Sequence, residues 1–285
     1  MASNLYRAFA PLVNLMPEKV RIQLLYAVKH KRFLRLKHPV TFNEKVNWRK
    51  LHDRAPIFSE LADKITVKEY VKGIVPEAKV PGILWCGDKL EELSAFEDLP
   101  DNYVIKANHA SGTNIIVNDG KHLAKNTLKR LGREWRRTRI DKTFVEWGYS
   151  NIPIKFFVEE FLDFSDFVPV DYKFWVFSGR VEFVQVDTDR FISHQRAFFD
   201  RDWVKLPFNL TYPDVRGDLN APKNFKSMID TAERLASNLD FVRVDLYSNN
   251  EDVFFGEITI YPDAGYGKFH PRRYDEIIGK LWSLD

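Results

Sequence analysis

The stretch that decides the fold is FVRVDLYSNNEDVFFGEITIYPDAGYG, residues 241–267. Apolar and polar side chains alternate over residues 241–247 and again over residues 253–261. This period of two is typical of β-strands that bury one face. The residues between the two runs, SNNED at 248–252, are of the types that favour a turn. The pattern therefore predicts a β-hairpin near the end of the chain.

The turn also predicts which side chains of the hairpin face one another. If it is centred on Glu251, Asp245 lies opposite Glu257, and Arg243 lies opposite Thr259. Side chains that are directly opposed across two strands lie roughly 5 Å apart at Cβ, so the two carboxylates repel each other. Three apolar residues of the second strand are expected on the other, buried face: Phe254, Ile258 and Ile260.

A bound cation would remove the repulsion between Asp245 and Glu257. Mg²⁺ suits the pair, because it takes one or two carboxylates and fills its other positions with phosphate oxygens and water. Arg243, on the same face, strengthens this interpretation, because Mg²⁺ and arginine together commonly neutralise a phosphoryl group during its transfer. The alternative is an exposed pair of carboxylates whose repulsion is screened by solvent and salt. The hairpin by itself leaves both interpretations open.

The composition is that of an ordinary globular protein and narrows the functional classes. The 285 residues suffice for one large domain or two small ones. A net charge of +3 is too small to indicate a nucleic-acid partner. Cys86 is the one cysteine, which excludes an intrachain disulfide and favours a reducing compartment such as the cytoplasm. No signal peptide and no apolar run long enough to span a bilayer is evident.

The first 60 residues are expected to form a helical region. Thr41 followed by Glu44 is a capping-box pattern, which predicts a helix that begins just after Thr41. The residues before it, 18–38, are rich in cations: Lys19, Arg21, Lys29, Lys31, Arg32, Arg35 and Lys37. We interpret these cations as a solvated helix face. The alternative is a peripheral contact with anionic lipid at the inner face of the cell membrane.

A strand and a loop in the first half of the chain are suited to a phosphate ligand. Residues 103–106 (YVIK) predict a strand that ends in Lys106, and a loop of mostly small residues, NHASGTN at 108–114, follows it. Backbone N–H groups in such a loop can approach phosphate oxygens closely, with Lys106 as a point charge at its base. An ordinary hairpin turn explains the same residues equally well.

Two more segments gather charged residues. Residues 62–72 (ADKITVKEYVK) predict a helix with three charged residues near one side: Asp63, Lys64 and Lys68. Taken alone, these three indicate no more than surface charge. Residues 171–177 (DYKFWVF) alternate and predict a strand with Asp171 and Lys173 on one face.

Six segments in this order resemble the ATP-grasp superfamily and, more narrowly, its TupA-like branch: TFNEKVNWRKLHD at residues 41–53, the ADK helix, IKANHASG, DYKF, FVRVDLY and FGEITIYP. The resemblance covers about residues 35–285. It implies an α+β, ATP-grasp fold in which two α/β subdomains with largely antiparallel sheets grip ATP. We expect a short helical N-terminal region over residues 1–60, a first subdomain with a phosphate-covering loop over 61–157, and a C-terminal subdomain with the metal site over 158–285.

The resemblance also implies roles for individual residues. Lys64 and Lys106 match the lysines that touch the phosphates of ATP. Three residues match the loop over the phosphates: Ser111, Gly112 and Thr113. Four residues match the hinge that binds the adenine edge, much of it through the backbone: Glu159, Glu160, Phe161 and Leu162. Asp171 matches an acidic residue that holds the ribose.

The remaining implied residues surround the γ-phosphate. Arg243 matches an arginine near that phosphate, and Lys173 points into the same cleft. Asp245 and Glu257 match the Mg²⁺ ligands. Thr259 stands where the family often has asparagine, and its hydroxyl can ligate Mg²⁺ directly or through water.

The activity that the resemblance implies is ATP-dependent ligation of a carboxylate to an amine or a similar nucleophile, through an acyl phosphate, with ATP and Mg²⁺ as cofactors. The TupA-like branch is associated with the synthesis of cell-surface polysaccharides. The expected partners are therefore a small molecule or glycan that bears a carboxylate, such as a uronic acid or an amino acid, and an amine co-substrate.

Other functions remain open on the sequence. Asp187-Thr188-Asp189 is a D-x-D triplet, which in glycosyltransferases carries the metal of a nucleotide sugar. An ATP-grasp kinase that phosphorylates a glycan hydroxyl would use the same nucleotide site. A non-enzymatic scaffold at the membrane surface would bind nucleotide without turnover. Several cations outside the motifs are expected either to hold an acidic substrate or to form structural ion pairs: Arg190, His194, Arg216, Arg272 and Arg273.

Overall fold

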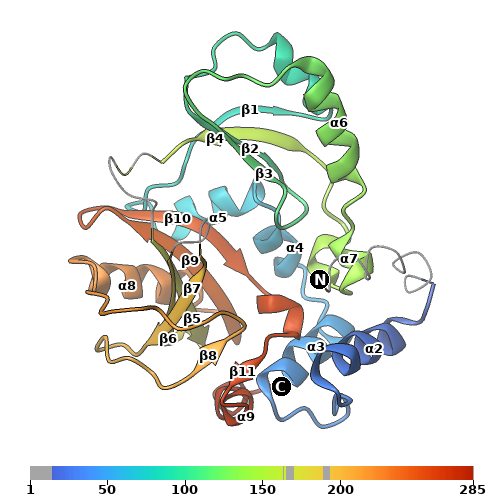
Figure 1. The fold of residues 1–285 in the computed structure, drawn as a ribbon, viewed down its shortest axis with the longest axis vertical. Helices are drawn as coiled ribbons and strands as arrows, with labels where there is room; N and C mark the ends of the chain where they lie inside the picture. The colour runs from blue at the N-terminus through green and yellow to red at the C-terminus, as the bar shows by residue number, and fades with distance from the viewer. Residues whose placement is uncertain (1–14, 163, 165–169, 189–192, 285) are drawn as a thin grey trace.

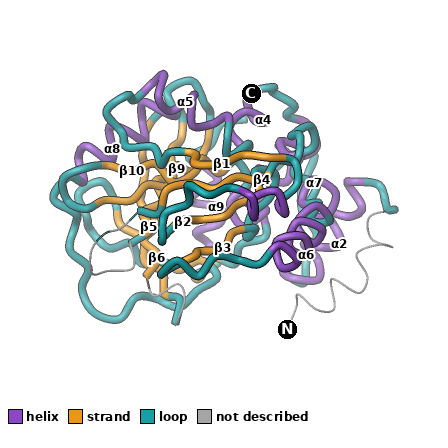
Figure 2. The backbone as a smooth tube through the Cα atoms, turned by 90° about the horizontal axis from the view of Figure 1, so that it is seen from above, coloured by secondary structure: helices purple, strands orange, loops and turns teal. Residues whose placement is uncertain are grey.

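Two antiparallel sheets, stacked one over the other, form the body of the protein. The computed structural model describes residues 15–162, 164, 170–188 and 193–284. Figure 1 shows a four-stranded sheet in the upper half of the molecule and a five-stranded sheet in the lower half. Figure 2, seen from above, agrees that the strands of one sheet lie over those of the other. The arrangement brings segments that are distant in sequence to a common boundary between the sheets.

The five-stranded sheet carries the predicted hairpin at one edge. Its strands, in spatial order and all antiparallel, are β10 (Val253–Thr259), β9 (Phe241–Ser248), β5 (Asp171–Phe177), β6 (Arg180–Thr188) and β7 (Gln195–Phe199). The central strand, β5, is buried along its whole length. Asp171 and Lys173, which alternate with its apolar residues, are therefore held inside the protein rather than on its surface.

The predicted pairing of the hairpin is confirmed. Asp245 lies opposite Glu257, and Arg243 lies opposite Thr259. The two carboxylates thus belong to neighbouring positions on one face of the sheet.

The prediction that Phe254 lies on the buried face is wrong. A β-bulge interrupts the register between Phe255 and Glu257, so Phe255 pairs with Leu246 and is only 2% exposed. The extra residue is Gly256, where a Cβ would lie 2.9 Å from the carbonyl oxygen of Asp245. A glycine permits this close approach of the two backbones, whereas a strict period of two does not anticipate it.

The four-stranded sheet is also antiparallel throughout. In spatial order its strands are β1 (Ile83–Gly87), β4 (Phe156–Glu160), β2 (Tyr103–Ala107) and β3 (Asn114–Val117). The expected division of the chain between residues 157 and 158 passes through β4. We propose that the division falls after Glu160 instead, because the whole of β4 pairs within this sheet.

Helices flank both sheets. The α-helices are α2 (Glu18–His30), α3 (Phe42–His52), α4 (Ile57–Ala62), α5 (Thr66–Ile74), α6 (Lys125–Arg136), α7 (Ile140–Thr143), α8 (Phe225–Leu235) and α9 (Arg273–Lys280). Short 3₁₀ helices are η1 (Leu90–Ala95), η2 (Trp147–Tyr149) and η3 (Pro262–Gly265), and β8 (Asn209–Leu210) pairs with β11 (Phe269–His270). Within the described ranges, none of the helices combines the length and the apolar character that crossing a bilayer requires.

The N-terminal part of the chain is helical where it is described. Thr41 caps α3 with a complete capping box, since its hydroxyl accepts from the Glu44 N–H and the Glu44 carboxylate accepts from the Thr41 N–H. The expected helix over residues 62–72 begins later, at Thr66, so Lys64 lies in the turn between α4 and α5. The part of the expected helical region before residue 15 lies outside the described residues.

An aromatic cluster attaches the N-terminal helices to the five-stranded sheet. The ring of Phe42, at the start of α3, lies 4.9 Å from that of Trp175 on β5 and 5.0 Å from that of Phe241 on β9. The ring of Trp282 packs at a tilt against that of Phe241, with the ring centroids 4.8 Å apart. All four side chains are buried, and such pairs stabilise beyond the area that they bury. The sheet that carries the hairpin is thereby fixed to α3 and to the C-terminal segment that contains Trp282.

Removing the cap of α3 tests how far this attachment depends on local capping. We expect Thr41→Ala to lower the free energy of unfolding by about 1 kcal/mol, because the substitution removes the hydroxyl group that caps the N-terminus of the helix. Urea denaturation measures the change. Thr41→Ser keeps the hydroxyl and serves as the control, and an equal loss in both variants would contradict the capping assignment.

Candidate active site

A cavity of about 260 Å³ lies between the two sheets. On the side of the four-stranded sheet and the segments next to it, the lining residues are Lys64, Lys68, Pro81, Lys106, Ser111, Gly112, Thr113, Asn114, Glu159 and Leu162. From the five-stranded sheet it is lined by Asp171, Lys173, Asp245, Tyr247, Phe255, Gly256 and Glu257. Most of the residues that the sequence singled out therefore meet in one place, although they are spread over nearly 200 positions of the chain.

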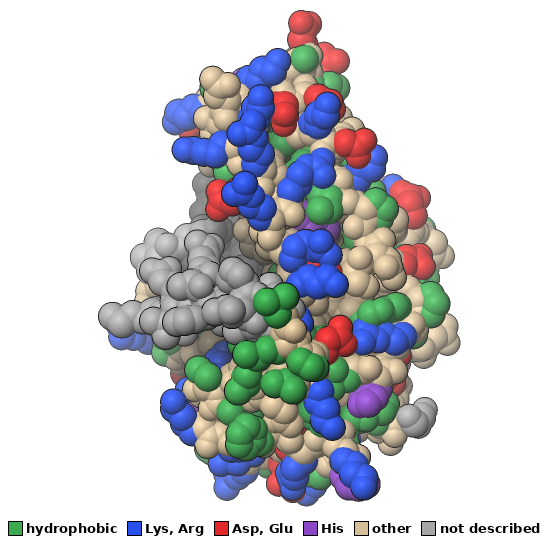
Figure 3. All heavy atoms as spheres, turned by 90° about the vertical axis from the view of Figure 1, so that its right-hand side faces the viewer, with side chains coloured by type: hydrophobic (Ala, Val, Ile, Leu, Met, Phe, Trp, Pro, Cys, Tyr) green, Lys and Arg blue, Asp and Glu red, His purple; other side chains and the backbone are tan. Residues whose placement is uncertain are grey.

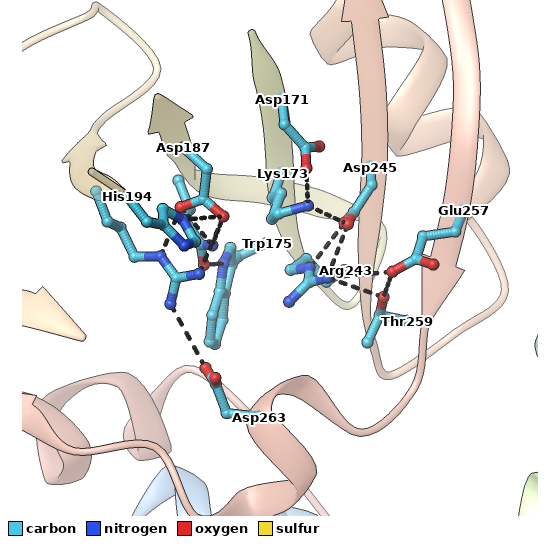
Figure 4. A network of polar contacts seen from close by, with 12 residues as sticks. Asp171, Lys173, Trp175, Asp187, His194, Arg243, Asp245, Glu257, Thr259 and Asp263 are labelled. Atoms are coloured by element: carbon cyan, nitrogen blue, oxygen red, sulfur yellow. Dashed lines mark hydrogen bonds and ion pairs between the residues drawn. The ribbon is translucent and has the colours of Figure 1, made fainter. Parts of the chain in front are cut away.

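Asp245 is the acidic centre on the five-stranded sheet (Figure 4). Its carboxylate accepts two hydrogen bonds from Arg243, both at 2.7 Å, and one from Lys173 Nζ at 2.6 Å. Lys173 Nζ also donates to Asp171 at 2.5 Å. Although burial disfavours the charged lysine, the two carboxylates outweigh it and raise the pKa of Lys173. Burial raises the pKa of the Asp245 carboxyl, an effect that Arg243 and Lys173 oppose, and the hydrogen bonds hold these groups in position.

Glu257 differs from Asp245 in its access to solvent. Its side chain is 44% exposed, whereas that of Asp245 is 2% exposed. Burial of its carboxyl group favours the neutral form, but Arg243, Lys173 and Lys64 more than compensate and lower the pKa of Glu257 to about 2. Glu257 is therefore an anion at physiological pH and faces the cavity with unused acceptor capacity.

Thr259 and Arg243 complete this side of the site. The Thr259 hydroxyl accepts from Arg243 at 3.0 Å and donates to Glu257 at 2.9 Å. Arg243 also approaches Glu257 at 3.4 Å. Burial opposes ionisation of the guanidinium, but the neighbouring Asp245 carboxylate raises the pKa of Arg243 above its usual value. The hydroxyl thus orients Glu257 rather than facing the cavity itself.

The oxygen atoms of Asp245 and Glu257 fit a hard divalent cation. Mg²⁺ favours carboxylate oxygens and completes its shell with phosphate and water. No group of three or more His, Cys, Asp or Glu side chains that could hold a metal occurs in the described part of the chain. A metal here would depend on oxygens supplied by a bound phosphate, which is how Mg²⁺ is usually held beside nucleotides.

Glu159 is the acidic centre on the opposite wall. Its carboxylate accepts from Lys68 Nζ at 3.0 Å and from Lys106 Nζ. Burial opposes the charged form, yet these two lysines lower the pKa of Glu159. Lys68 also donates to the Pro81 carbonyl oxygen at 2.7 Å. The interpretation of Lys68 as mere surface charge is wrong, because the residue is buried and lines the cavity.

Lys64 and the small-residue loop lie beside this lysine pair. Lys64 Nζ donates to the carbonyl oxygen of Ala110, within the loop. Gly112 has a φ of +70°, a conformation that favours glycine, at the tip between β2 and β3. His109, at the base of the loop, hydrogen-bonds the carbonyl oxygen of Trp135 on α6 at 3.1 Å. The loop is therefore anchored at His109 and Ala110, while Ser111, Gly112 and Thr113 border the cavity.

The predicted hinge residues do not all face the cavity. Glu159 and Leu162 line it, whereas the Glu160 carboxylate turns away and accepts from the Gly82 N–H at 2.7 Å. Phe161 is half-buried and is not among the lining residues. Because side chains alternate along β4, consecutive positions of the hinge cannot all point at one ligand.

Tyr247 is a cavity residue that the sequence interpretation did not select. Its ring lies 6.5 Å from that of Phe164, which in turn contacts Phe254 edge-on at 5.1 Å. The bulge at Gly256 turns Phe254 to this side of the hairpin. These rings offer an apolar surface beside the charged wall, which suits a nucleobase. In the sequence, only the period of two along residues 241–247 indicates that the Tyr247 side chain points to the same side of the sheet as that of Asp245.

The first aspartate of the D-x-D triplet has a structural role. Asp187 is buried and accepts from Arg196 at 2.6 and 3.0 Å and from Gln185 at 3.2 Å. Burial would raise its pKa, but the Arg196 guanidinium lowers the pKa of Asp187 to about 2. Asp189 and Arg190 lie outside the described residues. The Asp187 carboxylate is therefore already engaged in an ion pair.

With this geometry in place, a comparison with known families decides the assignment. The profile described as TupA-like ATPgrasp matches residues 44–283. The chain belongs to the TupA-like ATP-grasp family. The predicted family and the α+β, ATP-grasp fold are thereby confirmed. No curated protein matches this ATP-grasp chain.

Three solved structures similar to this TupA-like chain are the ATP-grasp ligase PsnB, a D-alanine–D-alanine ligase and the macrocyclase MdnC. PsnB, complexed with a phosphomimetic variant of a minimal precursor, Mg and ADP, has 13% identity and a TM-score of 0.41 over 85% of this chain and 59% of PsnB. D-alanine–D-alanine ligase from Bacillus anthracis has 16% identity and a TM-score of 0.43 over 79% and 68%. The macrocyclase MdnC from Microcystis aeruginosa, bound with the precursor peptide MdnA, has 12% identity and a TM-score of 0.42 over 82% and 64%. The chain spans about three-fifths of the length of PsnB.

The role of Lys68 in this ATP-grasp chain is tested by nucleotide affinity. We expect Lys68→Gln to weaken binding of ADP about tenfold, because a charge-assisted hydrogen bond contributes roughly 1.5–3 kcal/mol. Isothermal titration measures the dissociation constant. Lys72→Gln, one turn along α5 in an exposed ion pair with Glu69, is the matched control. Equal affinities in the two variants would remove Lys68 from the site.

Asp187 gives a prediction about acid stability. Its lowered pKa means that its contribution to stability is complete above about pH 4 and is lost as the pH falls through 2. We expect Asp187→Asn to lower the free energy of unfolding at pH 7 by about 3 kcal/mol, because it leaves Arg196 buried without its carboxylate. The variant should also lose less stability than the wild type between pH 4 and 2.

Denaturant titrations at several pH values measure both effects. The exposed Asp218→Asn is the control. A variant as stable as the wild type at pH 7 would show that the ion pair of Asp187 has no structural role.

Proposed function

We propose that this chain is an ATP-dependent ligase that joins a carboxylate to an amine or a similar nucleophile. The observation that carries the proposal is the cavity itself, in which the paired carboxylates Asp245 and Glu257 lie across from Lys64, Lys68 and Lys106. Family membership supports a nucleotide at this place. The cations of the cavity and the adjoining Arg243 outnumber its carboxylates, so an anionic triphosphate is favoured there.

The proposed reaction has two steps. An oxygen of the substrate carboxylate attacks the γ-phosphorus of ATP, the bond from that phosphorus to the β,γ-bridging oxygen breaks, and an acyl phosphate and ADP result. The amine nitrogen then attacks the acyl carbon, the bond from carbon to the phosphate oxygen breaks, and the amine releases a proton. The products are an amide, ADP and phosphate. No nucleophile from the protein is needed, so positioning and neutralisation of charge are the main contributions of the chain.

Each wall has a distinct role in the proposal. Lys64, Lys68 and Lys106 bind the phosphates, and the loop with Ser111, Gly112 and Thr113 covers them. Leu162 and the backbone of the hinge, with Tyr247, hold the base, while Asp171 is placed for the ribose. Such contacts convert binding into correct alignment of the reacting groups.

The other wall acts on the transferred phosphoryl group. Asp245 and Glu257 would hold Mg²⁺, with Thr259 orienting Glu257, and the metal would supply Lewis-acid neutralisation of the phosphate oxygens. Lys173 and Arg243, already charged and held by hydrogen bonds, stabilise negative charge as it develops on the transferred group.

The electrostatics favour a carboxylate acceptor over a hydroxyl. A kinase that phosphorylates a hydroxyl benefits from a general base. Among the described residues of the cavity, Glu159, Asp171 and Asp245 are each engaged by lysine or arginine. The pKa of Glu257, about 2, makes it a weak base. A carboxylate substrate is already ionised and requires no base for the phosphoryl-transfer step, which supports ligation over the kinase alternative.

We propose that the acid is a uronic acid or an amino acid of a cell-surface polysaccharide and that the protein acts in the cytoplasm at the inner face of the membrane. Support for the membrane contact comes from α2 and its flanks, which expose several large apolar side chains: Val20, Leu24, Val28 and Phe33. Not all of the basic residues of this region are available. Arg35 pairs with Glu44, and Arg21 donates to the carbonyl oxygen of Met16 at 2.8 Å.

Incubation with Mg²⁺, ATP and panels of uronic acids, amino acids and amines tests the ligase directly. We expect equal amounts of ADP, phosphate and a product whose mass is that of the acid plus the amine less one water. ADP with a phosphorylated glycan would indicate a kinase, and a nucleoside diphosphate released from a sugar nucleotide would indicate a glycosyltransferase. Binding of ATP without any turnover would support the scaffold.

Glu257 provides the cleanest test of the metal-binding wall. We expect Glu257→Gln to lower kcat by at least about a thousandfold, because it removes a carboxylate that would hold the metal. The fold should be retained, because the Glu257 side chain is partly exposed. Glu251→Gln, an exposed carboxylate in the turn of the same hairpin, is the matched control. Wild-type turnover in Glu257→Gln would contradict the assignment.

Asp245 is less suited to this test. Its carboxylate balances two buried cations, Lys173 and Arg243. Removing one member of a buried charge network costs about 3–5 kcal/mol, so a loss of activity in Asp245→Ala would combine metal loss with instability.

A further inference from the structure

The outer face of α6 carries a row of cations that the nucleotide site does not use. The helix is amphipathic, and its apolar side, with Leu128 and Trp135, packs on the four-stranded sheet. The opposite side exposes Lys129, Arg130, Arg133 and Arg137. With Asn126 and Glu134 these residues line an open depression of about 710 Å³. We call the four cations the α6 row; at 1.5 Å per residue they extend over about 12 Å.

The α6 row lies on one side of the molecule. Figure 1 places α6 at the upper right, and Figure 3, which faces that side, shows Lys and Arg side chains gathered over its upper part. Across the described ranges, no carboxylate pairs with any of the four cations. Arg139, just beyond the end of α6, behaves differently, since it pairs with Asp141 at 2.6 Å. The charge of the α6 row is therefore available to an external anion.

The same helix is connected to the proposed active site. The loop over the cavity begins at its base with His109, whose ring hydrogen-bonds the carbonyl oxygen of Trp135 at 3.1 Å. Trp135 lies between Arg133 and Arg137 in the sequence of α6 and its end. An anionic chain that lies along the α6 row thus contacts the helix that anchors the phosphate-covering loop.

We propose that the α6 row binds a carboxylate-bearing polymer, the acidic glycan that carries or adjoins the substrate. The inference rests on the proposed function, which requires an acid as substrate. Arginine binds carboxylates through two parallel hydrogen bonds, and three arginines on successive turns present such forks along a line. The surface would hold the polymer while one acidic unit enters the cavity, which raises the effective concentration of that unit.

Two other anionic partners fit the α6 row less well. A helix that binds a membrane surface inserts an apolar face, but the apolar face of α6 is buried against its own sheet. A nucleic-acid surface usually combines many phosphate contacts with exposed aromatic rings for stacking on single strands. The α6 row has four cations, and Trp135 is buried. A polymer of moderate charge density is the better match.

The experiment compares a triple variant of the α6 row with a matched triple variant elsewhere. The test protein is Arg130→Gln, Arg133→Gln and Arg137→Gln, in which glutamine keeps the helix propensity close to that of arginine. The control is Lys72→Gln, Lys223→Gln and Lys226→Gln, which removes three exposed cations away from α6 and gives the same change in net charge. Circular dichroism and thermal unfolding verify that both fold.

The probe is an oligogalacturonate, with dextran as the neutral polymer, in titrations at low ionic strength. We expect the wild type and the control to bind oligogalacturonate and not dextran, and the test variant to bind about tenfold more weakly, as three exposed ion pairs imply. If the test variant does not fold, the three single substitutions replace it, each with a proportionately smaller loss.

Several results would overturn the inference. Equal weakening in the two triple variants would show an effect of net charge alone, and no binding of oligogalacturonate by the wild type would remove the polymer site. A row that instead binds a DNA duplex or vesicles containing anionic lipid would identify a different partner. These titrations need no turnover, so they are independent of the ligase assay. Failure of ligation with intact polymer binding refutes the proposed function. Ligation without any polymer binding refutes the polymer site.

Discussion

The carboxylate of Asp245, held between Lys173 and Arg243, is the interaction on which the rest of the site depends. Three charged groups are buried on two neighbouring strands, where each alone would be strongly destabilising. Together they satisfy one another at 2.6–2.7 Å. This arrangement keeps two cations charged inside the protein and leaves Glu257, the more exposed carboxylate, to face the cavity.

A similar arrangement occurs on the opposite wall. Glu159 lies between Lys68 and Lys106 as Asp245 lies between Lys173 and Arg243. Each sheet therefore contributes one buried carboxylate that positions two cations at the cavity. A bound triphosphate would compete with these carboxylates for cations that are already in place, so little reorganisation is required when negative charge develops. The same pairing prevents like charges from forcing the walls apart when the cavity holds no anion.

The connection between the walls and the surface runs through α6. The apolar side of that helix completes the core of the four-stranded sheet, its carbonyl group at Trp135 anchors the phosphate-covering loop, and its outer side is basic. One helix thus links packing, the nucleotide site and an exposed surface. In the proposed function this explains how a large acidic substrate and a small, buried reaction centre can belong to the same protein.

Much of the hairpin and its site could be predicted from the sequence, because those features are local. The turn between residues 248 and 252 determines which residues are opposed, and the alternation of apolar side chains determines which face is buried. The capping of α3 by Thr41 follows from such short-range rules, whereas the pairing of Asp245 with Glu257 also needs the bulge at Gly256, because the register next to the turn would place Asp245 opposite Gly256. The family resemblance added the expectation that Lys64, Lys106 and Lys173 meet at one ligand.

Other features were decided only by the tertiary structure. The bulge at Gly256 depends on the approach of a second backbone, the burial of Lys68 depends on Glu159 from a distant strand, and the ion pair of Asp187 depends on Arg196 from the adjacent one. The local sequence around Lys68 and Asp187 is equally compatible with exposed charge. Amino-acid patterns determined where the strands lie in the sequence and which turns connect them. The environment of each charged group was decided by the packing of one sheet over the other, because the stability of a charge depends on the groups that surround it in space.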